Sequence, residues 1–471
     1  MKIKSRGLAM LLCAVMLAAL LTACGGVKET PSETQAASAG TTAAATTTAG
    51  APAEKVKITY SAWGTVEENK STQETMDRFN ASQDKATVEL MLIPWESYVA
   101  QLNTLAAAGN LPDSANLKEE MVKPWVAQDM LVDVSGMYSE EDKPLDAITF
   151  KANGKPVAYS VAAEVMVMYY NKTMFDKAQL PYPPSSVDKA WTWDQFVDTA
   201  KKLTIDKNGK HPTDTGFDAK NIVQYGALVE NLTWQLEWPV LSNGGAFFSE
   251  DGSKLRIGEP ASIEAIQKVA DLYLKDKVAP LSVGATDDGV SRGLIAGTVA
   301  MTTNGTWNVG TSLNKAKEEG LNYGIAVLPK LKNYVTIATG GTSVVFKQSK
   351  HPEEAMGWIK WQAKIENAWD GLISTGIWPP IFKKYYTDET LTHKWLDNPN
   401  FPPYAEYKSA AVDPVITDAT RSTAWMYTQN TADVYPLLGS ILGDVWSGKV
   451  TAQDAITKNL DKLQAAFEGK K

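Results

Sequence analysis

The chain has 471 residues, 44% of them hydrophobic, and a formal net charge of -8. An acidic chain of this kind is a poor candidate for non-specific nucleic-acid binding, so we expect no nucleic-acid partner. Both cysteines, Cys13 and Cys24, lie close to the N-terminus, which excludes a disulfide framework and a thiolate metal site in the body of the chain.

The first 24 residues have the pattern of a secretory signal. Three cations among the first six residues precede an apolar run over 8–21, which is too short for a comfortable transmembrane span. The ending Leu21-Thr22-Ala23-Cys24 resembles the lipobox of bacterial lipoproteins. That resemblance implies that residues 1–23 are removed and that Cys24 carries a diacylglycerol. The alternative is an ordinary signal peptide with an incidental cysteine.

A low-complexity segment over 24–54 separates this signal from the rest of the chain. It consists mainly of Gly, Ser, Thr, Ala, Pro and Glu, so it cannot bury enough apolar surface to fold. We expect a disordered tether that spans on the order of 30 Å as a random coil. The globular body would then be held at the cell membrane by its lipid, on the extracellular side, or in the periplasm of a Gram-negative cell.

Strands and helices alternate through the body. A strand over 56–60, a helix through 76–79, a strand over 88–92 and a helix from 98 to about 109 come first. This order predicts α/β layers with parallel strands. Thr192 and Gln195 form a capping box that begins a helix ending at 203. Further strands are expected at 165–170, 299–301, 323–328 and 342–346, and further helices at 263–273 and 451–467.

Several motifs occur in a fixed order from residue 60 to the C-terminus, and together they resemble one family. The family is the extracellular solute-binding proteins of ABC importers, and the resemblance is greatest to the sugar-binding branch that includes maltose-binding protein. The motifs are Asn110-Leu111-Pro112-Asp113, Tyr169-Tyr170-Asn171-Lys172, Trp191-Thr192-Trp193-Asp194-Gln195-Phe196, Ser242-Asn243-Gly244-Gly245, Asn304-Gly305 with Trp307, Gly340-Gly341 and Lys350-His351-Pro352-Glu353-Glu354.

The resemblance implies an α/β, two-lobed periplasmic-binding-protein-like fold with hinge strands and a central ligand cleft. The first lobe would hold 55–162 and 340–390, and the second 163–339 and 391–471. The chain would cross between the lobes just before Val165, near Ile337 and between about 385 and 405. The implied partners are a carbohydrate and the transmembrane subunits of an ABC permease, and we expect a monomer without a cofactor.

Fifteen tryptophans against three histidines favour flat apolar binding surfaces over metal or acid–base chemistry. Trp307 follows Asn304-Gly305 at a strand end, where it would stack on a sugar ring, as the matching residue does in the family. It would otherwise plug the lobe core. Glu164 matches a cleft glutamate of the family that accepts sugar hydroxyls, and the alternative is a solvated charge. Tyr435 matches an aromatic stacking residue.

Other candidates follow strand ends or family turns. Trp63, Glu67 and Trp95 follow the first two strands, and Asp113 and Glu120 lie after the Pro-Asp turn, where the family often places a polar ligand contact. Leu117 departs from the maltose-binding pattern, which has an aromatic residue there. Four further candidates are Trp234 and Trp238, which share a helix face and fit core packing equally well, Trp378 in an expected loop, and Gly341.

We interpret the chain as a binding protein rather than an enzyme, because no catalytic motif or metal-site pattern is present. Its ligand would be a carbohydrate, an oligosaccharide in the first place. One alternative is a secreted glycan-active enzyme, which would need two facing carboxylates. Another is a binding protein for a peptide, a polyamine or another polar solute.

Overall fold

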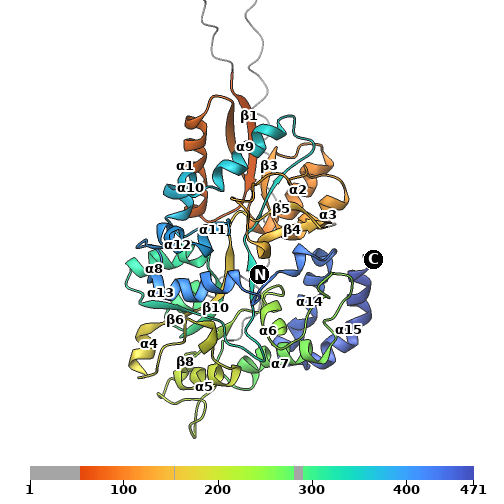
Figure 1. The fold of residues 1–471 in the computed structure, drawn as a ribbon. Helices are drawn as coiled ribbons and strands as arrows, with labels where there is room; N and C mark the ends of the chain where they lie inside the picture. Colours follow the sequence, from red (N-terminus) through yellow and green to blue (C-terminus); the bar gives the residue numbers. More distant parts are fainter. Residues whose placement is uncertain (1–53, 153, 281–289, 471) are drawn as a thin grey trace, which may run out of the picture. The chain divides into compact units, whose positions relative to one another are not determined.

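The computed structural model describes residues 54–470, except residues 153 and 281–289 and the side chains of 291 and 292 (Figure 1). The predicted signal, Cys24 and nearly all of the predicted tether therefore lie outside the described residues. Among the helices that are described, none has the length and apolar character needed to cross a membrane.

The first sheet is built mainly from the N-terminal part of this body and has the strand order β2-β1-β3-β13-β5-β4. β1 is parallel to β2 and β3, with Tyr60 paired to Leu90 and Ser114, so the predicted parallel strands are confirmed here. β13 returns antiparallel to β3. The strands are β1 (Val56–Ala62), β2 (Ala86–Leu92), β3 (Ser114–Leu117), β4 (Thr149–Ala152), β5 (Lys155–Tyr159) and β13 (Thr342–Val345).

The second sheet has the order β14-β12-β6-β10-β9, and β11 also pairs with β6. Its central strand β6 is antiparallel to β10, β11 and β12, whereas β10 is parallel to β9 and β12 is parallel to β14, so the expected parallel strands form only part of this sheet. β6 brings the chain in from the first sheet and β12 carries it back, so these two strands run in opposite directions. The strands are β6 (Glu164–Asn171), β9 (Leu228–Val229), β10 (Met301–Gly305), β11 (Tyr323–Ala326), β12 (Thr336–Thr339) and β14 (Thr420–Ser422).

The position of β6 in the fold explains its almost unbroken apolar sequence. Met166 and Met168 pack into one hydrophobic cluster, and Val165 and Val167 pack into another. Since side chains alternate between the two faces of a strand, both faces of β6 are buried.

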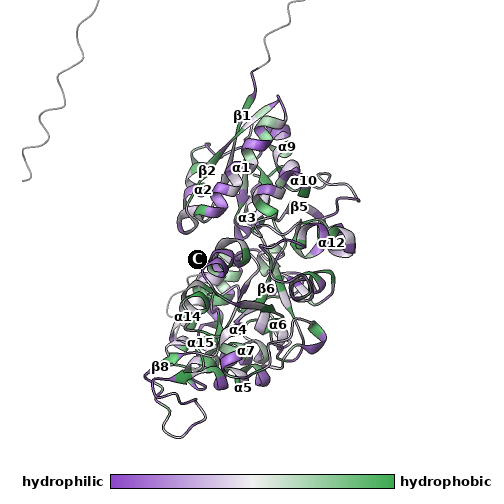
Figure 2. Cartoon of the chain, turned by 90° about the vertical axis from the view of Figure 1, so that its left-hand side faces the viewer, coloured by the Kyte–Doolittle hydropathy of each residue, from purple (hydrophilic) through white to green (hydrophobic). Residues whose placement is uncertain are grey.

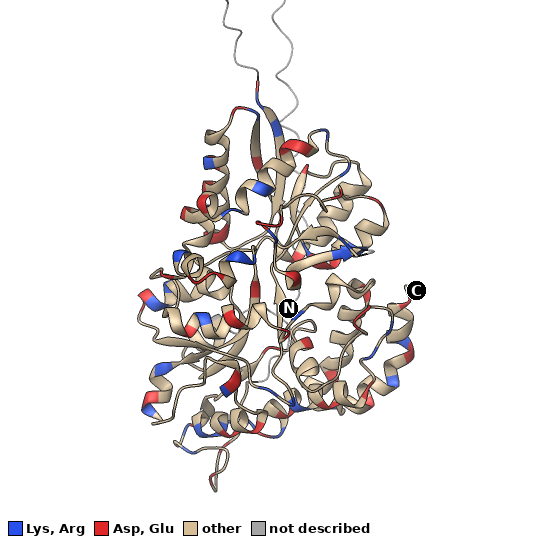
Figure 3. Cartoon of the chain, in the orientation of Figure 1, with Lys and Arg blue, Asp and Glu red and all other residues tan. Residues whose placement is uncertain are grey.

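Helices surround the two sheets, and α2, α5 and α15 begin at or next to the predicted residues 98, 192 and 451. Thr192 and Gln195 form the predicted capping box of α5. Figure 2 shows helices such as α1 and α9 with mixed hydrophilic and hydrophobic residues, as expected for helices with one buried face. Figure 3 shows acidic and basic residues interspersed along outer helices, which is typical of solvated surfaces. The longer helices are α1 (Val66–Ser82), α2 (Tyr98–Ala107), α3 (Glu119–Ala127), α5 (Trp193–Leu203), α7 (Pro260–Leu274), α9 (Pro352–Gln362), α12 (Glu389–Leu396), α14 (Thr431–Trp446) and α15 (Ala452–Phe467).

The remaining elements are short. Two of them, η1 and η9, are single turns that carry aromatic residues of the candidate site. These short elements include α4 (Lys172–Lys177), α6 (Glu237–Ser242), α8 (Asn314–Glu318), α10 (Ile365–Ala368), α11 (Lys384–Thr387), α13 (Tyr404–Tyr407), β7 (Ile205–Asp206), β8 (Ile222–Gln224), η1 (Trp95–Ser97) and η9 (Ala424–Met426).

The chain passes directly between the sheets at two places, residues 160–163 from β5 to β6 and Gly340-Gly341 from β12 to β13. A third passage lies between α10, which contacts α1, and α13, which contacts β11. In this passage the Pro379 carbonyl accepts a hydrogen bond from the Ala163 amide at 3.1 Å. The predicted third crossing between about 385 and 405 stays a prediction. The lobe boundaries at 162/163, 339/340 and 390/391 stay predictions.

Candidate functional site

Three aromatic rings gather at the carboxyl ends of β1 and β2. Trp63 follows β1, Trp95 begins η1 after β2, and Tyr98 begins α2. The ring centroid of Trp63 lies 5.2 Å from that of Trp95 and 4.9 Å from that of Tyr98, both in edge-on contacts. Tyr98 is fully buried, whereas Trp95 is 45% exposed. We call Trp63, Trp95 and Tyr98 the first aromatic group, which places two predicted ligand residues together.

Lys118 covers part of this group, and sequence reasoning missed it. The residue follows β3, and its Nζ lies 3.3 Å from the ring centroid of Trp95, a cation–π contact. Burial lowers the pKa of Lys118, and the nearby charges of Glu120, Glu119 and Glu96 oppose that shift. The ammonium group therefore orients Trp95.

A second aromatic group consists of Trp234, Trp307, Trp425 and Tyr435. The centroid of Trp234 lies 6.1 Å from that of Trp307 and 5.3 Å from that of Trp425, which is 6.0 Å from Tyr435. Trp234 and Trp307 are half-buried, and the other two are largely buried. The rings come from the segment before α6, the end of β10, η9 and α14, so only the fold brings them together.

Asn304 and Gly305 shape the turn that presents Trp307. The buried Asn304 Oδ1 accepts hydrogen bonds from the Gly305 amide at 2.7 Å and from Asn308 Nδ2 at 3.0 Å. A Cβ on Gly305 would lie 1.6 Å from the Trp307 ring, so only glycine lets this ring fold back over the strand end. The predicted candidate Asn304 is fully buried: its Oδ1 closes the turn, while its Nδ2 has no hydrogen-bond partner among the described residues.

Glu237 lies beneath the second aromatic group and was also missed. Its Oε1 accepts a hydrogen bond from the Tyr435 hydroxyl, and its Oε2 accepts one from the Ala424 amide at 2.9 Å. The side chain is 2% exposed. Burial raises the pKa of Glu237 to about 8, although both hydrogen bonds act to lower it. Through these two hydrogen bonds Glu237 joins η9 to α14.

Helix α3 connects the two aromatic groups. It contacts both η9 and α14. Glu120, in its first turn, is half-buried; burial raises its pKa, and the charge of Glu119 adds to the shift. The charge of Glu120 in turn contributes to the raised pKa of Tyr435, whose largest cause is burial. The charge of the predicted candidate Glu120 therefore reaches the predicted candidate Tyr435 across this contact.

Two predicted residues lie at the passages between the sheets instead. Glu164 begins β6 and pairs with Thr339 of β12. It is half-buried, and its charge contributes to the raised pKa of Tyr407, which burial causes in the first place. Gly341 has φ +65, and its amide donates a hydrogen bond to Glu119 Oε1 at 3.0 Å.

The structure does not bring the other four candidates into either group. Asp113 lies before β3, at its amino end, where its carboxylate accepts hydrogen bonds from the Thr59 amide at 2.8 Å and Ser349 Oγ at 2.6 Å. Glu67 is exposed in the first turn of α1. Trp238 is fully buried in α6, which confirms the core-packing alternative. Trp378 is only 8% exposed, so the expectation of an exposed loop aromatic is wrong.

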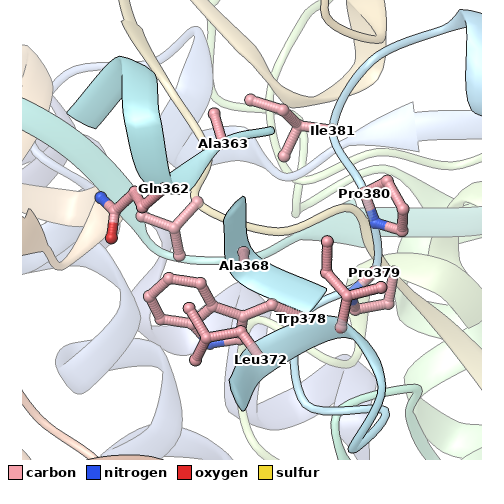
Figure 4. Close-up of a pocket in the computed structure, with 10 residues that line it drawn as sticks. Gln362, Ala363, Ala368, Leu372, Trp378, Pro379, Pro380 and Ile381 are labelled. Atoms are coloured by element: carbon pink, nitrogen blue, oxygen red, sulfur yellow. The ribbon is translucent and has the colours of Figure 1, made fainter. Parts of the chain in front are cut away.

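Trp378 instead lines a small cavity near the passages between the sheets (Figure 4). Pro379, Pro380 and Ile381 follow it along the wall, and Val161 comes from the first passage. The volume is about 10 Å³, enough for about one water molecule and far too small for a sugar.

Comparison with known proteins supports this architecture. Residues 74–403 match the family described as bacterial extracellular solute-binding protein. A putative binding protein of Brucella abortus (strain 2308) is 24% identical over 291 residues, which are 60% of this chain. The chain covers 66% of the length of that relative, just under two thirds.

Two further proteins are similar over more of their length. The maltodextrin-binding protein MdxE of Bacillus subtilis (strain 168) is 25% identical over 377 residues, which are 77% of this chain and 79% of MdxE. An ABC substrate-binding protein of Listeria monocytogenes, solved in complex with cycloalternan, has a TM-score of 0.69 at 22% identity, covering 88% of this chain and all of that chain. These likenesses show the two-lobed fold. The family match covers well over half of the residues of this chain, so the chain belongs to the bacterial extracellular solute-binding proteins.

Proposed function

We propose that the chain captures an oligosaccharide between its two lobes and delivers it to an ABC permease. The observation that carries this proposal is the pair of aromatic groups, one beside Lys118 at the start of α3 and the other beside η9 and α14, which α3 contacts. An indole ring stacks well on the apolar C–H face of a sugar, while a carboxylate accepts hydrogen bonds from sugar hydroxyls. Trp63 and Trp95 offer one such surface, and Trp234 and Trp307 offer another.

Two separate aromatic surfaces favour a ligand with more than one ring. The relatives agree with this reading, since one is named for maltodextrin binding and another was solved with cycloalternan. Leu117, where the maltose-binding branch has an aromatic residue, is fully buried in β3. The departure at Leu117 is therefore a difference in the core of the first sheet and not in a ligand contact.

The protein would bind its ligand by lobe closure and would be held at the membrane by a lipid anchor. A sugar held by both aromatic groups stabilises the arrangement in which they face each other, so the closed form would report occupancy to the permease. Cys24 would carry the lipid, and the segment over 24–54 would let the body turn near the membrane. The chain would act on no covalent bond of its ligand and would work as a monomer.

A thermal-shift screen of the full chain against mono- and oligosaccharides tests this proposal. A saccharide at 100 times its Kd stabilises the fold by about 2.7 kcal/mol, which is a readable shift. We expect a shift with one class of oligosaccharide and intact sugar afterwards. A shift only with peptides or polyamines would contradict the carbohydrate, and cleavage of the sugar would contradict the binding role.

A further inference from the structure

Glu119 is the first residue of α3, and its carboxylate is held by the passage from β12 to β13. Its Oε1 accepts hydrogen bonds from Thr339 Oγ1 at 2.5 Å, from the Gly340 amide at 3.2 Å and from the Gly341 amide at 3.0 Å. The side chain is only 4% exposed. Charge-assisted bonds of this kind are stronger than neutral ones, and a buried carboxylate without them is strongly destabilising.

Gly340 and Gly341 allow the backbone of this passage to point two consecutive amides at Glu119 Oε1. Gly340 has φ +147 and Gly341 has φ +65, which are backbone conformations that side chains disfavour. A Cβ on Gly340 would lie 2.1 Å from the Ala162 carbonyl oxygen, and one on Gly341 would lie 2.2 Å from Asn116 Oδ1. The Gly340 backbone therefore lies against the other direct passage, residues 160–163. Consecutive amides that converge on one site form an anion-binding nest, and here Glu119 fills it.

The residues around Glu119 contact both the β12–β13 passage and residues of the two aromatic groups. Asn116 Oδ1 accepts a hydrogen bond from the Thr342 amide at 3.0 Å, while the Asn116 carbonyl accepts one from the Tyr98 hydroxyl at 2.5 Å. Lys118 lies over Trp95, and Glu120 acts on Tyr435. One short segment, residues 116–120, thus joins the passage to the first aromatic group and to α14.

We propose that Glu119 is a positioning residue that fixes the backbone of the β12–β13 passage and thereby sets the angle at which the two lobes present their aromatic groups. This inference depends on one part of the proposed function, namely that the two lobes move relative to each other to hold a sugar. Hinge motion concentrates φ and ψ changes in a few residues, and Gly340 and Gly341 are such residues. A carboxylate that binds both amides restricts those changes without touching the sugar.

Substituting Glu119 by glutamine keeps the shape of the side chain but removes the charge that the two amides and the Thr339 hydroxyl share. We expect Glu119→Gln to broaden the range of lobe orientations in the sugar-free protein. Because a smaller fraction of molecules would then have the binding-competent angle, affinity for the saccharide found in the thermal screen should fall about fivefold or more.

Asp206 provides a matched control. It is 1% exposed in β7, and it accepts hydrogen bonds from the amides of Asn208, Lys210 and Asp218 at 2.7, 2.9 and 2.7 Å. None of these residues belongs to a passage between the sheets. Asp206→Asn should therefore lower the melting temperature as Glu119→Gln does, but it should leave lobe orientation and affinity unchanged.

The measurement is a spin-label distance distribution between the lobes of the sugar-free full chain. Since Cys13 and Cys24 are the only cysteines, replacing both by serine allows unique labels at Lys57→Cys in β1 and Lys449→Cys after α14. The side chains of Lys57 and Lys449 are 74% and 69% exposed. This readout needs no sugar, so it tests Glu119 even if the carbohydrate proposal fails in the wild-type screen.

A broader or shifted distribution for Glu119→Gln, with that of Asp206→Asn unchanged, is the expected result. Distributions that match the wild type in both variants would overturn the proposal, whatever happens to the melting temperature. If Glu119→Gln does not fold, Thr339→Val removes one donor and keeps the carboxylate, and it must broaden the distribution as well. An unaltered distribution in a folded Thr339→Val protein would then count against the role of Glu119.

Discussion

At the scale of single residues, Trp307 combines exposure with a fixed orientation. Its ring is half-buried, rests over Gly305 and lies beside Trp234. A side chain held in this way loses little conformational entropy when a sugar stacks on it, so most of the stacking energy remains available for binding. Replacing Trp307 should therefore weaken sugar binding while the protein still folds.

Trp307→Ala should weaken oligosaccharide binding by about 2 kcal/mol, or roughly thirtyfold, because aromatic residues in such positions carry much of the binding energy. Trp361→Ala is the matched control, since Trp361 is also half-buried and lies 6.2 Å from another tryptophan, Trp358. Titration calorimetry of both variants decides the question. Equal affinities in the two variants would remove Trp307 from the binding site.

Glu237 predicts a pH dependence of stability. Its pKa is about 8 in the folded chain because of burial, against about 4.5 for an ordinary glutamate, so between these values the folded state binds the proton more tightly than the unfolded state. This contribution to the free energy of unfolding is fully present below pH 4.5 and falls with rising pH up to about 8, by at most about 1.4 kcal/mol per pH unit.

Denaturant unfolding from pH 5 to pH 9 measures this effect. Glu237→Gln keeps the neutral form at every pH, so the difference between wild type and variant isolates Glu237 from all other titrating groups. We expect the wild type to lose stability relative to the variant as pH rises to about 8, and then no further. A difference that stays constant with pH would show that Glu237 is ionised in the folded chain.

At the scale of elements, the strand β10 and the turn after it form one unit. The side chain of Asn304 closes the turn, and Gly305 leaves room for the ring of Trp307. β10 itself is held between β6 and β9, so the turn is fixed to the centre of the second sheet. The binding surface thus depends on a residue that carries no side chain.

Gly305→Ala should therefore abolish stacking by displacing the Trp307 ring while β10 keeps its pairing with β6. Affinity should fall about as far as in Trp307→Ala. Gly357→Ala in α9 is the control, because a Cβ there meets no atom within 4 Å and alanine favours a helix over glycine by about 1 kcal/mol. Unchanged affinity in a folded Gly305→Ala protein would contradict the proposed orientation.

How far the sequence predicts this structure depends on how local each feature is. The alternation over 56–60, the apolar run over 165–170 and the capping box at Thr192 are local patterns, and β1, β6 and α5 form where they occur. Glu237 could not be recognised, because its partner Tyr435 is 198 residues away in the chain. Trp378 was misjudged because a loop next to two prolines is here packed into a core cluster.

At the scale of the whole molecule, the proposed lipid anchor makes a separate prediction. Cys24→Ser should move the protein from the membrane fraction into the soluble fraction, since the serine hydroxyl does not replace the thiol that the lipid would modify. Cys13→Ser is the matched control, because Cys13 lies inside the apolar run of the predicted signal. Fractionation followed by immunoblotting reads the result, and membrane retention of Cys24→Ser would contradict the anchor.

The second aromatic group also gives the molecule an optical property of its own. Trp234 lies between Trp307 and Trp425, with ring planes inclined by 41° and 43°. Electronic transitions of indoles so close and so inclined couple, and coupled chromophores in a chiral arrangement produce a paired positive and negative band in circular dichroism. A sugar that turns Trp307 even slightly would alter this coupling, so the protein should report its own occupancy in polarised light without any added dye.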